Sequence, residues 1–127
     1  MKQDEIQDIL DHAYPLIKSY FGKGKLDYPK IDTSHNNTYA MHSGEPEAEG
    51  EHSASSIAEY HMGTIYLYLP NITNEEELLR ALVHEYTHYT QDSKLFAKYR
   101  DMYDYDEDPT EIEAHKNEEK WQLFSKK

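Results

Sequence analysis

Two histidines and a glutamate stand in the pattern His84-Glu85-Tyr86-Thr87-His88. In an α-helix, positions i and i+4 end about 40° apart after one turn, so the two imidazoles project side by side and can share one ion. Catalytic zinc takes three protein ligands and keeps a fourth position for water, whose pKa it lowers toward about 7. Glu85 lies about 100° around the helix from His84, where it can hold that water and accept its proton. The pattern therefore predicts a hydrolytic zinc site.

A third zinc ligand must come from the chain that follows this helix. The candidates are a histidine, two glutamates and four residues of an acidic connection: His115, Glu111, Glu113, Asp104, Asp106, Glu107 and Asp108. The inward face of the next predicted helix is marked by Ala114 and Trp121. Relative to that face, Glu111 and Glu113 lie at similar angles, of about 70° and about 90°, on opposite sides. Glu111 can also form a capping box with Asp108, which would compete with metal binding. Helical geometry leaves the choice open.

The HExxH helix and the segment Glu111-Ile-Glu-Ala114 on the next helix, with 22 residues between His88 and Glu111, resemble the gluzincin group of zinc metallopeptidases. The most similar members are its small single-domain forms: minigluzincins, ImmA/IrrE-type peptidases and similar phage-encoded peptidases. The resemblance covers roughly residues 64–121. It implies hydrolysis of peptide bonds and one zinc ion held by His84, His88 and Glu111.

In those families an Asp or Asn stands four residues after the ligand glutamate and often supports a zinc-binding histidine. This chain has His115 at that position, which makes His115 the candidate for the supporting role. Two related groups are excluded. A metzincin would have a glycine and a third histidine where this chain has Gln91 and Lys94, and the Gly-Thr that precedes the ligand aspartate of aspzincins is also missing.

Zincins usually hold an extended substrate against an edge strand just upstream of the metal-binding helix. The resemblance assigns this role to residues 64–69, and so places Thr64 and Tyr66 at the substrate. Peptide hydrolysis also needs a hydrogen-bond donor for the oxyanion that develops. By residue type, the candidates are Tyr103, Tyr105, His52 and His61. The partner expected for such a site is a protein or peptide substrate.

These residues must be positioned by a single domain, 1–127, because this length leaves little room for a second one. We expect an α+β, zincin-like fold with a short, mostly antiparallel sheet. Its predicted parts are an N-terminal helix at 1–21, a sheet region at 26–70 with a loop at 44–56, the HExxH helix at 74–91 and a C-terminal glutamate helix at 109–124.

Local signals support these boundaries. Pro15 falls inside the first helix and predicts a kink or a break there. Thr73 and Glu76 can form a capping box at the start of the HExxH helix. Asp108 followed by Pro109 is typical of the start of another helix. Tyr86 and Tyr89 are expected to pack the HExxH helix onto the core.

Composition excludes several other classes of protein. The chain contains no cysteine, which rules out disulfides, thiol nucleophiles and Cys-ligated metal sites. Its formal charge of −12 repels the phosphate backbone of nucleic acids and anionic membranes. No apolar run approaches the roughly 18 residues of a membrane span, and no signal peptide is evident, so we expect a cytoplasmic protein. The negative charge favours one alternative function: a non-catalytic zincin-like or acidic module that docks a basic protein partner.

Overall fold

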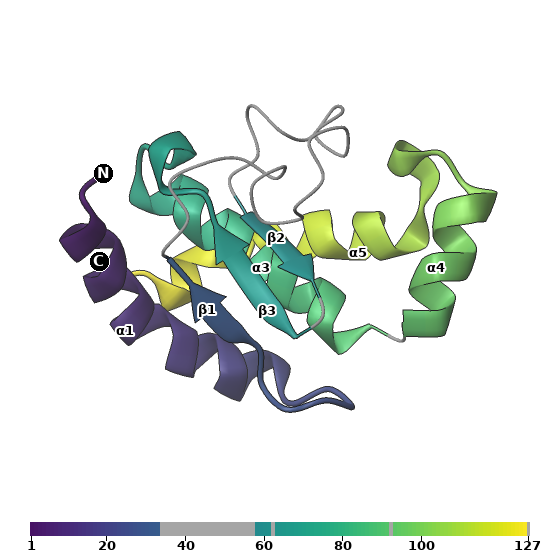
Figure 1. Ribbon diagram of the computed structural model, residues 1–127, viewed down its shortest axis with the longest axis horizontal. Helices are drawn as coiled ribbons and strands as arrows, with labels where there is room; N and C mark the ends of the chain where they lie inside the picture. The colour runs from purple at the N-terminus through teal and green to yellow at the C-terminus, as the bar shows by residue number, and fades with distance from the viewer. Residues whose placement is uncertain (34–57, 62, 92, 127) are drawn as a thin grey trace.

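The computed structural model describes residues 1–33, 58–61, 63–91 and 93–126, which form a small α+β domain (Figure 1). The described helices are α1 (Gln3–Phe21), α3 (Glu75–Thr90), α4 (Ser93–Met102) and α5 (Pro109–Glu118). The strands are β1 (Lys30–Asp32), β2 (Ala58–His61) and β3 (Thr64–Leu67). Three short 3-10 turns complete the described part: η2 (Leu69–Asn71), η3 (Tyr105–Glu107) and η4 (Trp121–Phe124). Part of the predicted sheet region, 34–57, which includes the loop at 44–56 and His52, lies outside the described residues.

The described strands form one mixed sheet in the order β1-β3-β2. β3 pairs in parallel with β1, with Ile31 opposite Ile65, and antiparallel with β2, with Tyr60 opposite Ile65. The prediction that residues 64–69 form an edge strand is therefore wrong, because β1 covers the second side of β3. The sheet was expected to be mostly antiparallel, but one of the two described strand pairings, β1 with β3, is parallel. β2 is the edge strand nearest to α3.

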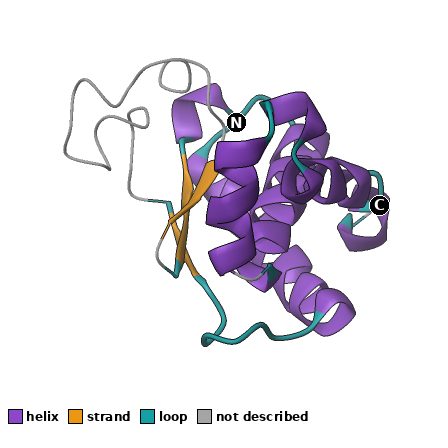
Figure 2. Cartoon of the chain, turned by 90° about the vertical axis from the view of Figure 1, so that its right-hand side faces the viewer, coloured by secondary structure: helices purple, strands orange, loops and turns teal. Residues whose placement is uncertain are grey.

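The described helices gather on one side of the sheet, so the domain has two layers (Figure 2). Between the layers lies a continuous apolar core to which α1, β3 and α3 contribute most of the buried side chains: Ile6, Ile9, Leu10, Ala13, Ile17, Ile65, Leu67, Leu78, Leu79, Leu82 and Val83. Burying one such aliphatic side chain contributes about 1.5–3 kcal/mol. α3 is thus held in the centre of the molecule by packing on several faces.

Tyr86 and Tyr89 pack α3 onto the core, as predicted. Both rings are buried, and their hydroxyls donate to the backbone oxygens of Gly22 and Leu26 at 2.5 Å and 2.6 Å. Gly24 donates its N–H to the Tyr89 hydroxyl, and a Cβ at Gly24 would lie only 3.1 Å from the backbone oxygen of Tyr89. The segment that follows α1 is therefore fastened to the helix that carries the two histidines.

Helix α1 runs without a break through Pro15, so the expected interruption does not occur. Pro15 lies on the exposed face of α1, as does Asp11, whose backbone oxygen loses its helical partner there. Water can satisfy that oxygen, while Ala13 and Ile17 on the opposite face are fully buried and hold the helix against the core.

The start of α3 is one residue later than predicted. Asn74, and not Thr73, is the N-cap, and its side chain accepts the N–H of Glu77. Glu77 in turn accepts from the backbone N–H of Thr73 at 3.1 Å. The predicted capping box is therefore replaced by a related pattern, in which Glu77 returns to Thr73, the residue before the N-cap.

Two further differences concern the second half of the chain. α4 was not expected, and the described side chains of this helix are exposed or half-buried. The last helix ends at Glu118, and Trp121–Phe124 forms a separate 3-10 turn that buries Phe124. None of the described helices is both long enough and apolar enough to cross a membrane.

Candidate metal centre

Helix α3 packs against α5 (Figure 1), and the two histidines of the HExxH pattern contact Glu111 of α5. Their spacing of four residues puts both rings on the face of α3 that α5 covers. His84 is 8% exposed and His88 is 9% exposed, and their rings meet edge to face. Burial of two imidazoles side by side requires polar partners on the facing helix.

Glu111 of α5 supplies that partner. Its Oε1 lies 3.0 Å from Nε2 of His84 and 3.2 Å from Nε2 of His88, and the two nitrogens are 3.2 Å apart. Ligands at the usual zinc distances of about 2.0–2.2 Å stand about 3.3–3.6 Å apart at the corners of a tetrahedron. The three atoms thus form a nearly regular triangle that is slightly smaller than the face of such a tetrahedron.

The outer nitrogens of both rings are already hydrogen-bonded. Nδ1 of His84 donates to Oε2 of Glu118 at 2.6 Å, since an ionised carboxylate only accepts. Nδ1 of His88 donates to Oε1 of Gln91 at 2.8 Å, because the amide nitrogen of Gln91 donates to the backbone oxygen of Thr110. In a neutral ring, Nε2 therefore carries a lone pair directed at Glu111, so the site can offer three electron-pair donors to one ion; a ring that takes up a proton donates from Nε2 to Glu111 instead.

The charges at this point favour a bound cation. Burial lowers the pKa of His84, but its hydrogen bonds to Glu111 and Glu118 outweigh burial and raise the pKa to about 10. The pKa of His88 is also raised, because Glu111 and Glu85 outweigh burial. Burial raises the pKa of Glu111, and the hydrogen bonds from the two histidines reverse this and hold it well below its usual range. A proton can bridge only two of the three converging atoms, whereas a divalent ion can bind all three.

Glu85 lies beside this triangle without joining it. Its Oε1 accepts the backbone N–H of Tyr60 at 2.9 Å, and its Oε2 is 4.0 Å from Nε2 of His84. Burial raises the pKa of Glu85, and the two histidines and the N–H of Tyr60 oppose that shift. The edge strand β2 therefore holds one carboxylate oxygen in place and leaves the other facing the histidines.

The start of α5 explains why Glu111 is available. Asp108 is the N-cap, and one of its oxygens accepts both the N–H and the hydroxyl of Thr110. The carboxylate of Glu111 therefore does not return to the helix end, and it points at the histidines. Glu113, the other candidate, is exposed and accepts a hydrogen bond from Gln91.

His115 lies at the margin of the site. One ligand atom each from His84, Glu111 and His115 fall within 4.8 Å of one another, so this trio is a second possible metal-binding group. The nitrogens of His115, however, contact Oε2 of Glu118 at 3.0 Å and the hydroxyl of Tyr105 at 2.8 Å. His88 completes a tighter set, and we assign His84, His88 and Glu111 as the candidate ligands.

The other predicted residues divide into those near the site and those away from it. The Tyr105 hydroxyl hydrogen-bonds Nε2 of His115 at 2.8 Å, whereas Tyr103 packs its ring on Tyr99 of α4. Thr64 and Tyr66 lie on the central strand, where both backbone edges are paired. His61 is exposed at the end of β2, and three acidic candidates of the connection are also exposed: Asp104, Asp106 and Glu107.

Three contacts of the site were missed in the sequence: those of Glu118, Gln91 and the backbone of Tyr60. A signal for Glu118 exists, because Glu111, His115 and Glu118 recur at i, i+4 and i+7 and so share one face of α5. Gln91 and Tyr60 carry no comparable pattern, since their roles depend on where α5 and β2 pack.

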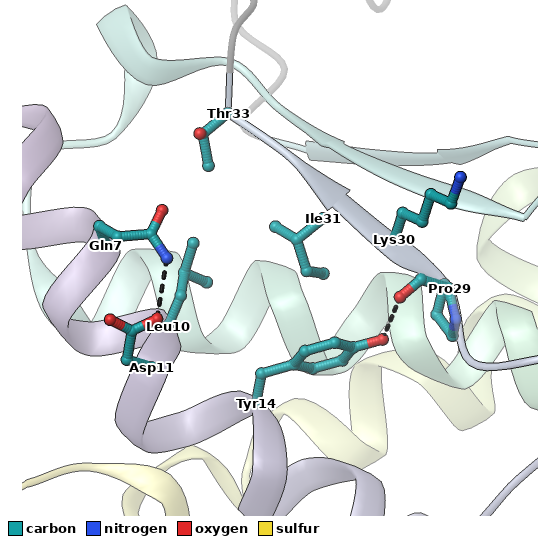
Figure 3. Close-up of a pocket in the computed structure, with 8 residues that line it drawn as sticks. All are labelled: Gln7, Leu10, Asp11, Tyr14, Pro29, Lys30, Ile31 and Thr33. Atoms are coloured by element: carbon teal, nitrogen blue, oxygen red, sulfur yellow. Dashed lines mark hydrogen bonds between the residues drawn. The ribbon is translucent and has the colours of Figure 1, made fainter.

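A separate hollow of about 230 Å³ opens between α1 and β1 (Figure 3). It is lined by Gln7, Leu10, Asp11, Tyr14, Pro29, Lys30, Ile31 and Thr33. The Tyr14 hydroxyl donates to the backbone oxygen of Pro29 across its floor, and no residue of the candidate metal centre takes part.

Comparison of the chain with protein-family models, curated proteins and solved structures gives no match. The function is therefore inferred from the residues of the site.

Proposed function

We propose that this protein is a zinc-dependent peptidase of the zincin type, in which His84, His88 and Glu111 hold one zinc ion. The observation that carries the proposal is the convergence of three metal-binding atoms, within 3.2 Å of one another, beside a buried glutamate. Two histidines and a carboxylate are the ligand set of hydrolytic zinc sites, which leave one position open.

Each residue then has a defined task. Zinc supplies Lewis-acid chemistry, because it polarises a carbonyl group and lowers the pKa of water. Glu85 accepts a proton from the attacking water and passes it to the leaving amine, and its raised pKa suits both transfers. The Tyr105 hydroxyl, which lies 2.8 Å from Nε2 of His115 at the margin of the site, is the candidate donor to the developing oxyanion.

The outer edge of β2 is the proposed place for the substrate backbone, in place of residues 64–69. The N–H of Tyr60 points away from β3 toward Glu85, which shows that this edge faces the HExxH helix. An extended peptide can add to an exposed edge by main-chain hydrogen bonds. Its scissile bond would then lie beside the carboxylate of Glu85.

The activity is tested with a complex mixture of peptides, because the preferred sequence is unknown. We expect zinc-loaded protein to generate new peptide termini, a chelator to abolish them and added zinc to restore them, as read by mass spectrometry. Cleavage that survives complete removal of the metal would contradict the proposal, and so would the absence of new termini throughout the mixture.

Zinc binding should release protons. The pKa of His84 is raised to about 10, so at pH 7 the metal-free protein carries a proton that zinc must displace. We expect the apparent zinc affinity to rise about tenfold per pH unit for each proton released, between pH 6.5 and 10. The contribution of His84 to the free energy of unfolding of the metal-free protein falls as the pH rises. It is complete below pH 6.5 and is lost as the pH rises through about 10, because the folded pKa exceeds the unfolded one.

Calorimetric titration with zinc at pH 7, in two buffers with different ionisation enthalpies, measures the number of protons released. At least one is expected. Zinc binding without any release would mean that His84 is not a ligand.

A further inference from the structure

The second ring of contacts around the candidate metal centre is built on one face of α5. Glu111, His115 and Glu118 follow one another at i, i+4 and i+7 and face His84 of α3. The hydroxyl of Tyr105, from the turn just before α5, lies 2.8 Å from Nε2 of His115. One face of α5 thus carries the candidate ligand Glu111 together with His115 and Glu118, which contact the candidate ligand His84.

Within this set, the carboxylate of Glu118 is the group that contacts both His84 and His115. Its Oε2 accepts Nδ1–H of His84 at 2.6 Å, and Nδ1 of His115 lies 3.0 Å from the same oxygen, so this oxygen lies between two imidazoles. Only 19% of its side chain is exposed, against 52% for His115. Charge-assisted hydrogen bonds of this length in a largely buried place are strong and directional.

The contacts of Glu118 determine how His84 is oriented. An imidazole ring can rotate about its bond to Cβ, and rotation would carry Nε2 away from Glu111 and His88. The hydrogen bond at Nδ1 prevents this and also fixes the proton on Nδ1, which leaves the lone pair on Nε2. His115 holds Glu118 from the other side, and the Tyr105 hydroxyl lies at the far nitrogen of His115.

We propose that Glu118 is a positioning residue of the metal centre, which fixes Nε2 of His84 for metal binding through a carboxylate that His115 holds in place. This inference rests on the proposed zinc site, since Glu118 acts through His84. It assigns the supporting role to Glu118, three residues beyond His115, and makes His115 a partner of the carboxylate.

The test compares Glu118→Gln with Glu119→Gln. Glu119 is the exposed neighbour on the same helix end, so both variants lose the same charge at nearly the same place. Loss of a group that orients a metal ligand typically costs 10–100-fold in affinity. We expect the zinc dissociation constant, measured by competition with a chromogenic chelator, to rise about 10–100-fold in Glu118→Gln and to change less than about twofold in Glu119→Gln.

The visible spectrum of the cobalt-substituted protein is the second readout. We expect it to change in Glu118→Gln and to match the unmodified protein in Glu119→Gln, because only Glu118 contacts a ligand. A merely structural role of Glu118 would lower the melting temperature of the metal-free protein without altering this spectrum.

The outcomes separate the two proposals. If the unmodified protein binds zinc and both glutamine variants bind it equally well, the role of Glu118 is overturned and the metal centre stands. If the unmodified protein binds no zinc, both are overturned. If Glu118→Gln does not fold by circular dichroism, His115→Ala decides, because release of Glu118 from its second partner should also weaken zinc binding and an unchanged affinity would overturn the inference.

Discussion

Replacement of Glu85 by glutamine should lower peptide hydrolysis about 10²- to 10⁴-fold, the usual contribution of a positioned general base. The amide has almost the shape of the carboxylate, and its oxygen can still accept the N–H of Tyr60, so the local structure should persist. The loss therefore reports proton transfer. It is measured as initial rates on those peptides that the unmodified protein cleaves, at equal zinc loading.

Glu76→Gln is the matched control for that variant. Glu76 lies on the same helix, and about half of its side chain is exposed. It pairs with Arg80 at 2.8 Å and not with a residue of the candidate metal centre. We expect its rates to stay within about twofold of those of the unmodified protein, as is usual for exposed ion pairs. Full activity in Glu85→Gln would refute the mechanism, even if zinc binding were confirmed.

Zinc should raise the melting temperature strongly. A ligand at about 1,000 times its dissociation constant stabilises the folded state by about 4 kcal/mol. Unfolding of 127 residues has an entropy of about 0.27 kcal/mol/K, so the expected shift is about 15 °C. Thermal unfolding is followed by circular dichroism with zinc and with excess chelator, at the same protein concentration.

His88→Ala should remove most of that shift. A lost ligand should cost at least as much as a lost supporting group, about 100-fold, which at the same zinc concentration reduces the shift to about 5 °C or less. If zinc and chelator leave the melting temperature of the unmodified protein unchanged, the chain is instead better explained as an acidic binding module. Its affinity for a basic partner should then fall steeply with salt.

The sequence predicts the chemistry of the site better than its surroundings. Spacing within one helix brings His84 and His88 together whatever the rest of the fold does. The choice between Glu111 and Glu113 could not be made from helical angles, because it depends on the Asp108 cap and on the rotation of α5 against α3. Once the cap is satisfied by Thr110, Glu111 is free to face the histidines.

The order of the strands shows why the sheet was harder to predict. β2 and β3 are neighbours in sequence, and either could be the edge of the hairpin they form. The answer depends on β1, whose pairing of Lys30 with Thr64 joins residues more than thirty positions apart. Helix α4 was missed although an apolar stripe at helical spacing marks it, made of Leu95, Phe96, Tyr99 and Met102. In the structure the described side chains of this helix are exposed or half-buried, so the described part of the stripe does not join the core.

The site spans two helices that are joined by a long connection, and this has a mechanical consequence. A metal ion held by His88 and Glu111 would cross-link α3 to α5 and close a loop of 22 intervening residues that contains α4. Closing a loop of this length with a disulfide contributes about 3–4 kcal/mol by restricting the unfolded chain. The chain has no cysteine with which to make such a link. A proteolytic cut within α4 should therefore leave two fragments that are held together more tightly with the metal bound than after its removal, when only the packing of α5 and Phe124 on the core joins them.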